Sequence, residues 1–158
     1  MERKYRMLDA TDLKILDILQ KDARTFNAEI ARQVDLVPSA VLERIRRLEK
    51  QGVIEGYTAR VNPQALGLPL AAFVSVRAQE RLGAAETARQ LAKLPEVLEV
   101  HHIAGEDCLM VKVRSADTVG LNHLLRDGFG KIRSIRSTNT TIVLETVKET
   151  SALPLHEP

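Results

Sequence analysis

Hydrophobic residues in the first part of the chain recur at spacings of three and four, which is the period of an amphipathic helix. The pattern predicts a helix over about residues 10–22, with Asp9 as its N-terminal cap and Asp12 in its first turn. A second helix of barely two turns follows Asn27, which can cap it, and ends near Val34. The chain therefore opens with two short, amphipathic helices.

A third helix is expected between Pro38 and Gly52, because proline suits the first turn of a helix and glycine commonly ends one. Three short helices with a tight turn before the third follow the helix-turn-helix plan, in which the third helix enters the major groove of DNA. Rotation by about 100° per residue predicts that one side of this helix packs inward. That side holds Val41, Leu42, Ile45 and Leu48.

The pattern changes after Gly52. Residues 53–61 hold strand-like residues with an internal glycine, and residues 62–69 hold two prolines and a glycine. We therefore expect a domain boundary in this region. The predicted parts are a winged-helix-like helix-turn-helix domain over residues 1–62, a linker over 63–69, a second domain over 70–150 and a disordered tail over 151–158.

The second domain has the pattern of alternating strands and helices. Its segments are a buried strand (70–78), a helix (83–94), two strands that form a hairpin (97–104 and 108–115), a helix (116–132) with Val119 facing inward, and a last strand (137–148) in which residues such as Leu144 alternate. The order β-α-β-β-α-β predicts a ferredoxin-like sheet with two helices on one face. The fold class is therefore α+β. Because the first strand is apolar on both sides, the open face of the sheet predicts homo-oligomerisation through this domain.

Composition narrows the location and the partners. The formal net charge is only +2, so a polyanionic partner must be recognised by a local arrangement of charge. The single Cys108 cannot form an internal disulfide, and no apolar run reaches the length of a membrane span. We expect a cytoplasmic protein that does not bind membranes.

The polar side of the third helix is the candidate nucleic-acid surface. Small residues at its start allow the backbone to approach base edges, and arginine grips phosphate or guanine with a planar fork. A solvated surface helix with ordinary intrahelical charge pairs is the alternative. The candidate DNA-binding residues are Pro38, Ser39, Ala40, Glu43, Arg44, Arg46, Arg47 and Lys50.

The stretch LERIRRLEKQGVIEGY, within residues 8–148, resembles the Lrp/AsnC (feast/famine) family of transcriptional regulators. The resemblance implies that the first domain binds double-stranded DNA and that the second pairs through its sheet into dimers, which assemble into tetramers or octamers. It also implies an amino-acid effector held between dimers, by the turn after the second strand and by a Thr-x-Thr in the last strand. The corresponding residues are Gly105, Glu106, Asp107, Thr138 and Thr140.

The chemistry fits an amino acid, because backbone amides, hydroxyls and a carboxylate satisfy both of its charged groups. An ordinary hairpin turn and ordinary strand threonines are the alternative. The turn here reads Gly-Glu-Asp-Cys-Leu, which departs from the family's usual pattern, and Val37 stands where a capping serine is common. Asp35 replaces a frequent glycine in the turn before the third helix and tolerates positive φ.

No catalytic, cofactor or metal site is predicted. His101 and His102 are adjacent in a strand, so they point to opposite faces and cannot chelate one metal together. Cys108 stands beside two acids, which do not favour a thiolate. The sequence thus favours a DNA-binding regulator that responds to a small effector over an enzyme. The alternative function is an amino-acid-sensing assembly protein whose helix-turn-helix domain contacts protein.

Overall fold

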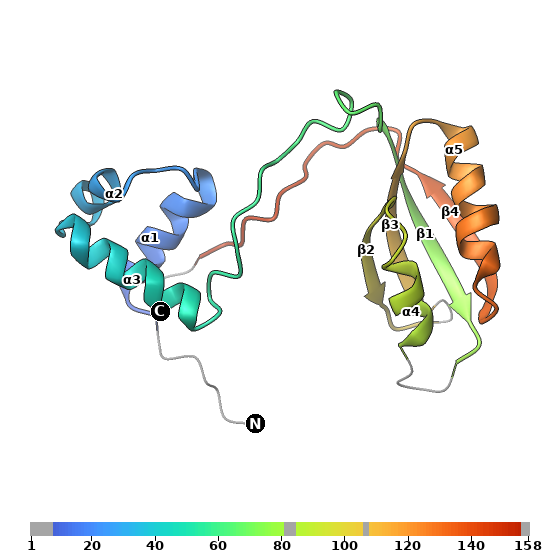
Figure 1. Cartoon of the computed structure of the whole chain (residues 1–158), viewed down its shortest axis with the longest axis horizontal. Coiled ribbons are helices and arrows are strands. Elements are labelled where there is room, and N and C mark those ends of the chain that lie inside the picture. The colour runs from blue at the N-terminus through green and yellow to red at the C-terminus, as the bar shows by residue number, and fades with distance from the viewer. Residues whose placement is uncertain (1–7, 81–84, 106–107, 156–158) are drawn as a thin grey trace. The chain divides into compact units, whose positions relative to one another are not determined.

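The computed structural model describes residues 8–80, 85–105 and 108–155. The chain divides into two compact units (Figure 1). The helical unit comprises Met1–Ala59 together with Lys148–Pro158, and the sheet unit comprises Arg60–Val147. The chain therefore passes from one unit to the other twice, once before the sheet and once after it.

Three helices form the helical unit: α1 (Ala10–Lys21), α2 (Asn27–Val34) and α3 (Pro38–Lys50). Their apolar faces meet in one small core, as the helical period of the sequence predicts. Burial of these side chains, together with partly buried neighbours, holds three helices that are too short to be stable alone. The buried members are Ile15, Ile30, Ala31, Val41 and Ile45.

The helix ends explain where each element starts and stops. Asp9 and Asp12 form a reciprocal capping box at the start of α1, with the Asp12 amide donating to the Asp9 carboxylate at 2.7 Å. The prediction that Asn27 caps α2 is wrong, because Asn27 is already the first helical residue and Phe26 occupies the cap position without a side-chain hydrogen bond. Gly52, at φ 71°, closes α3 in the left-handed conformation that ends many helices.

Asp35 also adopts positive φ, at 55°, in the turn between α2 and α3. Aspartate tolerates this conformation better than most residues, as expected from the sequence. Residues 51–69 contain no strand in the structure. This segment leads from α3 to the sheet unit.

Four strands form one antiparallel sheet: β1 (Leu70–Ala78), β2 (Val97–His102), β3 (Leu109–Ser115) and β4 (Ile135–Ile142). The strand order is β2-β3-β1-β4, so the first strand lies between the third and the fourth. Helices α4 (Glu86–Leu91) and α5 (Thr118–His123) cover the same face of the sheet (Figure 1). This is the α+β arrangement that the order of the predicted elements indicates.

The core of the sheet unit lies between the sheet and its two helices. Val74, Val76 and Val111 point from the strands into it, where Phe129 and Leu91 fill the space from the helical side. All five are essentially inaccessible to solvent. Truncating a side chain such as Phe129 to alanine would cost about 3–5 kcal/mol by the usual cavity penalty.

Several expectations about the sheet unit need correction. The predicted helix over 116–132 is a regular α-helix only through His123. A wider π-helical turn (Leu124–Gly128) and a tighter 3-10 turn (Phe129–Lys131) follow it. Val119 faces outward, with 62% of its surface exposed. The last strand ends at Ile142, although the Val143 amide still donates to the Ala71 carbonyl of β1 at 2.9 Å, and Leu144 beyond it is 98% exposed.

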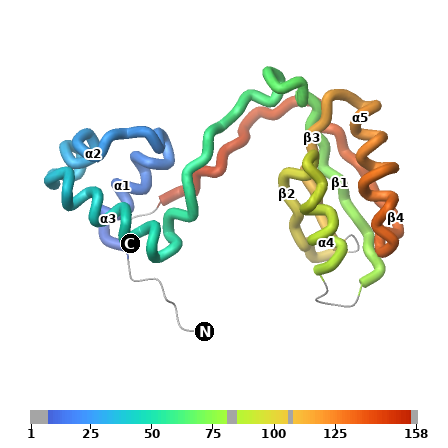
Figure 2. Tube along the Cα trace, viewed as in Figure 1, coloured from blue at the N-terminus to red at the C-terminus, as the bar shows by residue number. Residues whose placement is uncertain are grey.

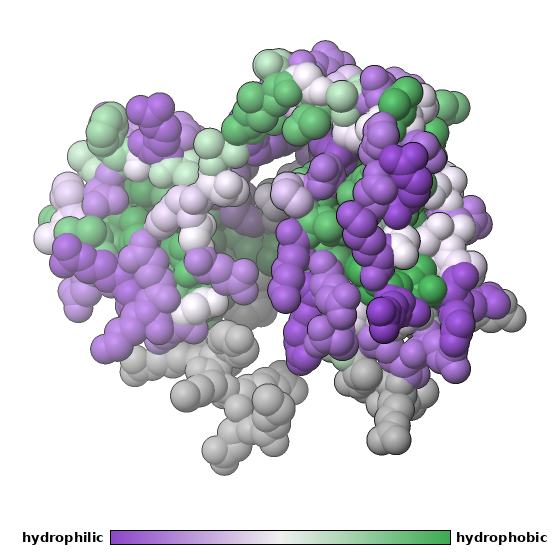
Figure 3. Space-filling model, turned by 45° about the vertical axis from the view of Figure 1, so that its right-hand side comes forward, coloured by the Kyte–Doolittle hydropathy of each residue, from purple (hydrophilic) through white to green (hydrophobic). Residues whose placement is uncertain are grey.

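The open face of the sheet is less apolar than expected. The strand register places Phe73 and Ser75 on the side away from the helices, beside Met110 and Lys112 of β3. Phe73 is 39% exposed, and it shares this face with Met110 and with polar side chains such as Lys112. Hydrophobic residues reach the surface of both units on the face shown in Figure 3.

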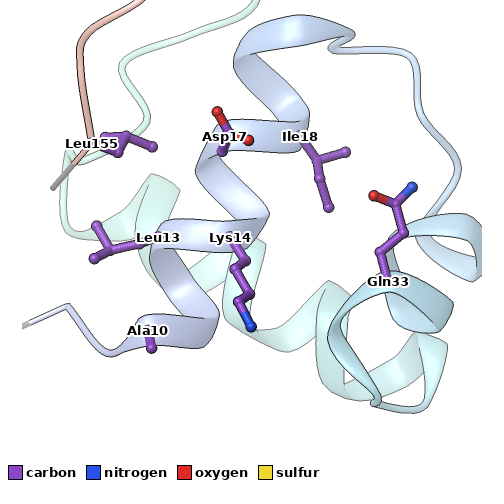
Figure 4. A pocket seen from close by; sticks show the side chains of 7 residues that line it. All are labelled: Ala10, Leu13, Lys14, Asp17, Ile18, Gln33 and Leu155. Atoms are coloured by element: carbon purple, nitrogen blue, oxygen red, sulfur yellow. The ribbon is translucent and has the colours of Figure 1, made fainter. Parts of the chain in front are cut away.

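The predicted tail has no regular secondary structure over residues 151–155, and residues 156–158 lie outside the described residues. Figure 2 traces the segment after β4 back to the helical unit. There the Leu153 amide donates to the Gln20 carboxamide at 2.7 Å, and the Gln20 carboxamide donates to the Leu153 carbonyl at 3.1 Å. Leu155 lies beside Leu13 in a groove along α1 (Figure 4).

Candidate DNA-binding surface and effector site

Helix α3 is divided lengthwise into three faces. Val41, Ile45 and Leu48 are buried and face the other helices. Leu42 was expected to join them, but it lies at the margin with 36% of its surface exposed. The two remaining faces carry all four cations of the helix, and they differ in whether those cations have a partner.

The first charged face of α3 is bound to α1. Arg44 donates through Nη1 to Asp9 Oδ2 at 2.7 Å and to Asp12 Oδ1 at 2.8 Å. Arg47 donates through Nη2 to both carboxylate oxygens of Asp12, each at 2.8 Å. The Asp12 side chain is only 4% exposed, whereas those of Arg44 and Arg47 are 25% and 39% exposed. A single buried carboxylate thus receives two guanidinium groups.

The ion pairs shift the pKa values of Asp9 and Arg44, which lie at the solvent-exposed side of this network. The hydrogen bond from Arg44 holds the pKa of the Asp9 carboxyl below its usual range, with a further contribution from the Asp12 amide. The same contacts to Asp9 and Asp12 raise the pKa of Arg44 above its already high value. The Asp9 carboxylate and the Arg44 guanidinium are therefore both charged at neutral pH.

The second charged face points outward. Ser39, Glu43, Arg46 and Lys50 follow one another at spacings of four, three and four residues, which places them on one side of the helix. All four are exposed. Among the described residues, the side chains of Glu43, Arg46 and Lys50 have no hydrogen-bond or ion-pair partner. Pro38 and Ala40 stand at the start of the helix, where only small side chains occur.

The structure thus separates the predicted DNA-binding residues into two sets. Arg44 and Arg47 lie in the ion-pair network with α1, and Ser39, Glu43, Arg46 and Lys50 form the outward set. Sequence reasoning missed the role of Asp12 as their common partner. The only feature of the sequence that could have indicated this role was a second acid in the first turn of α1. An acid there is equally expected as a capping residue or as a favourable charge at the helix N-terminus.

Of the candidate effector residues, Gly105 and Thr138 lie toward the same end of the sheet. Gly105 adopts φ 135° in the turn between β2 and β3, a conformation that requires glycine, and a side chain there would meet nothing within 4 Å. Glu106 and Asp107 lie outside the described residues. Leu109, just after the turn, and Thr138 of β4 both pair with the same β1 residue, Val76. About 10 Å, or two strand spacings, therefore separates their backbones.

Thr138 and Thr140 alternate with residues of the opposite face. Thr140 pairs with Val74, so it points to the helix-covered side of the sheet, whereas Thr141 pairs with Phe73 on the open side. Thr140 is half-buried and Thr138 is exposed. The two candidate threonines therefore share one face, as a joint site would require.

We also searched the described residues for a metal site. In residues 8–80, 85–105 and 108–155, no group of three or more His, Cys, Asp or Glu side chains could hold a metal ion. His101 binds Glu99 at 3.1 Å, and this carboxylate also accepts from Lys112. These contacts hold the pKa of Glu99 below its ordinary value. Within the same described part of the chain, no helix is long and apolar enough to cross a membrane.

Two family models match the two units. The model of a winged helix-turn-helix DNA-binding domain matches residues 8–55, which hold all three helices and the ion-pair network. The model of the Lrp/AsnC ligand-binding domain matches residues 71–153, just over half of the chain. The chain belongs to the Lrp/AsnC family. It is accordingly a DNA-binding transcriptional regulator and not an enzyme.

Relatives along the whole chain agree with this assignment. The HTH-type transcriptional regulator FL11 of Pyrococcus furiosus is 40% identical over 149 residues, covering 94% of this chain and 97% of the relative. The leucine-responsive regulatory protein of Escherichia coli is 36% identical over 156 residues, covering 96% and 94%. The match to each Lrp/AsnC regulator therefore includes both units.

Solved structures of the family have the same fold. The transcriptional regulator NMB0573 of Neisseria meningitidis, in complex with L-Met, superposes with a TM-score of 0.88 at 32% identity, covering 94% of this chain and 97% of the other. The feast or famine regulatory protein Rv3291c of Mycobacterium tuberculosis, complexed with L-methionine, gives 0.85 at 34% identity, covering 96% and 100%. Escherichia coli AsnC gives 0.87 at 28% identity, covering 94% and 100%.

The network predicts a large loss of stability on removing the Asp12 charge. Asp12→Asn should lower the free energy of unfolding of the helical unit by about 2–3 kcal/mol, because a buried partner of two arginines is lost while their remaining exposure softens the penalty. Urea unfolding followed by circular dichroism measures the change. The control is Asp17→Asn, which breaks the exposed Asp17–Lys21 pair and should cost less than about 0.5 kcal/mol. Equal losses in the two variants would contradict this account of the network.

Proposed function

We propose that the outward face of α3 is the surface of this regulator that binds the major groove of double-stranded DNA. The observation that carries the proposal is that Arg46 and Lys50 are exposed and without partners among the described residues, on the side of α3 opposite its buried face. Their charges are therefore available to phosphates. Ser39 and Ala40, at the start of the helix, allow its backbone to approach base edges. Because its proposed partner is DNA, we propose that the protein is cytoplasmic.

The proposal assigns different tasks to the arginines. Arg44 and Arg47 keep their charge close to Asp9 and Asp12, so much of their field is neutralised within the unit. Arg46 and Lys50 carry no such compensation. Direct phosphate contact therefore belongs to the second pair, and removal of Arg44 or Arg47 would weaken DNA binding by loosening α3.

Salt dependence tests the phosphate contacts. For each phosphate contact that Arg46→Ala or Lys50→Ala removes, the slope of log affinity against log salt should become shallower by about 0.9, because fewer counterions are released. The probe is a mixed-sequence duplex, and binding is followed by fluorescence anisotropy over a range of salt. Arg89→Ala, which removes an exposed arginine from α4, is the control and should leave the slope unchanged. Wild-type protein that bound no duplex at any salt would overturn the proposed surface.

We further propose that an amino acid is the effector and that it binds near Gly105, Glu106, Asp107, Thr138 and Thr140. Support comes from the two relatives solved in complex with L-methionine and from the strand register, which places the turn and Thr138 at the same end of the sheet. Hydroxyls and backbone amides can bind a carboxylate, and an acidic side chain can bind an ammonium group. The site lies between dimers in this proposal, which makes binding and assembly interdependent.

A thermal-shift panel of the twenty amino acids tests the effector. A ligand of the native protein should raise the unfolding temperature, with stabilisation near 2.7 kcal/mol at a concentration of about one hundred times its Kd. Thr140→Ala should reduce the shift. Thr58→Ala is the control, because it removes an exposed threonine of the helical unit and should retain the full response. A panel in which no amino acid raises the unfolding temperature would count against the proposal.

We propose in addition that the open face of the sheet joins two copies of the chain into a dimer, and that dimers associate further into tetramers or octamers. Phe73 lies near the middle of β1, on the face that the helices leave uncovered, and 39% of its surface is exposed. Covering it against the same face of a second copy would form a two-fold interface. The polar neighbours Ser75 and Lys112 suit a mixed interface of this kind.

Replacing this aromatic residue with a charged one tests the dimer. Phe73→Glu should shift the protein from an oligomer toward a monomer of 17.6 kDa, because it would bury an unpaired carboxylate in the interface. Sedimentation equilibrium measures the mass. Val119→Glu supplies the control, since Val119 is an exposed apolar residue on α5, away from the open face, and should leave the mass of the assembly unchanged. A monomeric wild-type protein would contradict the interface directly.

A further inference from the structure

Glu43 is an unexpected residue for a surface that approaches a polyanion. It stands one turn after Ser39 on the outward face of α3, between the small residues at the helix start and the cations Arg46 and Lys50. A carboxylate among phosphates is repelled, so an acid at this position weakens non-specific binding. Unless it has a partner in the complex, Glu43 opposes the function of the face that carries it.

The ordinary explanation for such an acid is an intrahelical ion pair. Arg46 and Arg47 lie three and four residues beyond Glu43, which are the two spacings at which side chains on a helix meet. Neither forms the pair. Arg47 is turned to Asp12, at 2.8 Å from both of its oxygens, and Arg46 has no partner among the described residues. The network with α1 therefore engages Arg47, one of the two possible partners of Glu43, and the Glu43 carboxylate is exposed and unpaired among the described residues.

We infer that Glu43 is a specificity-determining residue that accepts a hydrogen bond from the N4 amino group of a cytosine in the major groove, an inference that rests on the proposed function of α3. Cytosine is the base that fits best. It presents an amino donor in the groove, whereas guanine presents the acceptors O6 and N7 and thymine presents O4, all of which repel a carboxylate. Adenine has an amino donor but places the N7 acceptor beside it.

Position on the helix supports base contact. The N-terminal part of a recognition helix lies deepest in the groove, and its later turns approach the phosphates. Glu43 is the sixth residue of the thirteen-residue helix, whereas Arg46 and Lys50 belong to its second half. The acid therefore lies where base edges are read, and the two cations lie where the backbone passes. This order lets one helix attract the duplex and still discriminate between sequences.

Selection from a randomised duplex pool tests the inference with the full chain. Wild-type protein should enrich duplexes with a fixed C·G pair at one position of each half-site. In the pool selected by Glu43→Ala that position should become degenerate while the other positions keep their preference. The matched control is Glu49→Ala, which removes an exposed acid from the same helix whose carboxylate accepts from the Tyr57 hydroxyl at 3.0 Å. Its pool should equal that of the wild type.

Affinities measured on two duplexes complete the test. Exchanging the selected C·G pair for T·A should weaken wild-type binding by about 5- to 150-fold and should leave Glu43→Ala unaffected. On a mixed-sequence duplex, Glu43→Ala should bind at least as tightly as wild type, because a repulsive charge is gone. Circular dichroism confirms that this surface substitution leaves the helices intact.

The outcomes separate the two proposals. If wild-type protein enriches no sequence and binds no duplex, the proposed DNA surface itself fails. If wild-type protein enriches a sequence and Glu43→Ala enriches the same one, the surface stands and the role of Glu43 is refuted. Loss of preference at every position in the Glu43→Ala pool would also refute it, because that result indicates a residue that orients α3 as a whole.

Discussion

The carboxylate of Asp12 is the interaction on which the arrangement of the helical unit depends. It is almost completely buried, yet it accepts from its own N-terminal cap partner across the capping box and from two arginines of α3. A buried charge of this kind is tolerated only when it is fully paired, since an unpaired one would carry a large desolvation penalty. The start of α1 and the middle of α3 are therefore held to each other by contacts that tolerate few alternative geometries.

This arrangement determines what α3 can present to a partner. One face packs on the core through Val41, Ile45 and Leu48, and a second is bound to α1 through Arg44 and Arg47. Only the remaining face is free, and its orientation is set by the other two. Recognition of DNA needs a helix held in a fixed register, because phosphate contacts position the protein before base edges are read. The ion pairs supply rigidity, and the outward side chains supply the contacts.

Local patterns in the sequence were sufficient for the elements and their order. The capping acids of α1, Pro38 and Gly52 around α3, and the apolar run of β1 predicted their elements closely because each depends on neighbours in sequence. The errors concern contacts over longer distances. A helical wheel cannot decide whether a marginal residue such as Val119 finds a covering element.

The same limit applies to the candidate site. Helical spacing suggests ion pairs within α3, but Arg44 and Arg47 bind Asp12 instead, an acid more than thirty positions earlier in the sequence. The Gln20–Leu153 contact spans most of the chain and had no sequence signal. Family resemblance supplied the effector residues, and no periodicity in the turn at Gly105 would have identified them.

The small net charge of the chain is consistent with this internal use of its arginines. Of the four cations on α3, two are paired with acids of α1, and the two that point outward share their face with the carboxylate of Glu43. A single copy of the helix therefore offers few phosphate contacts and would bind DNA weakly on its own. Joining several copies raises the effective concentration of each further helix once the first has bound, so affinity can come from the number of helices while each one remains discriminating. A regulator built in this way has a physical reason to assemble, because its recognition helix devotes half of its positive charge to holding its own position.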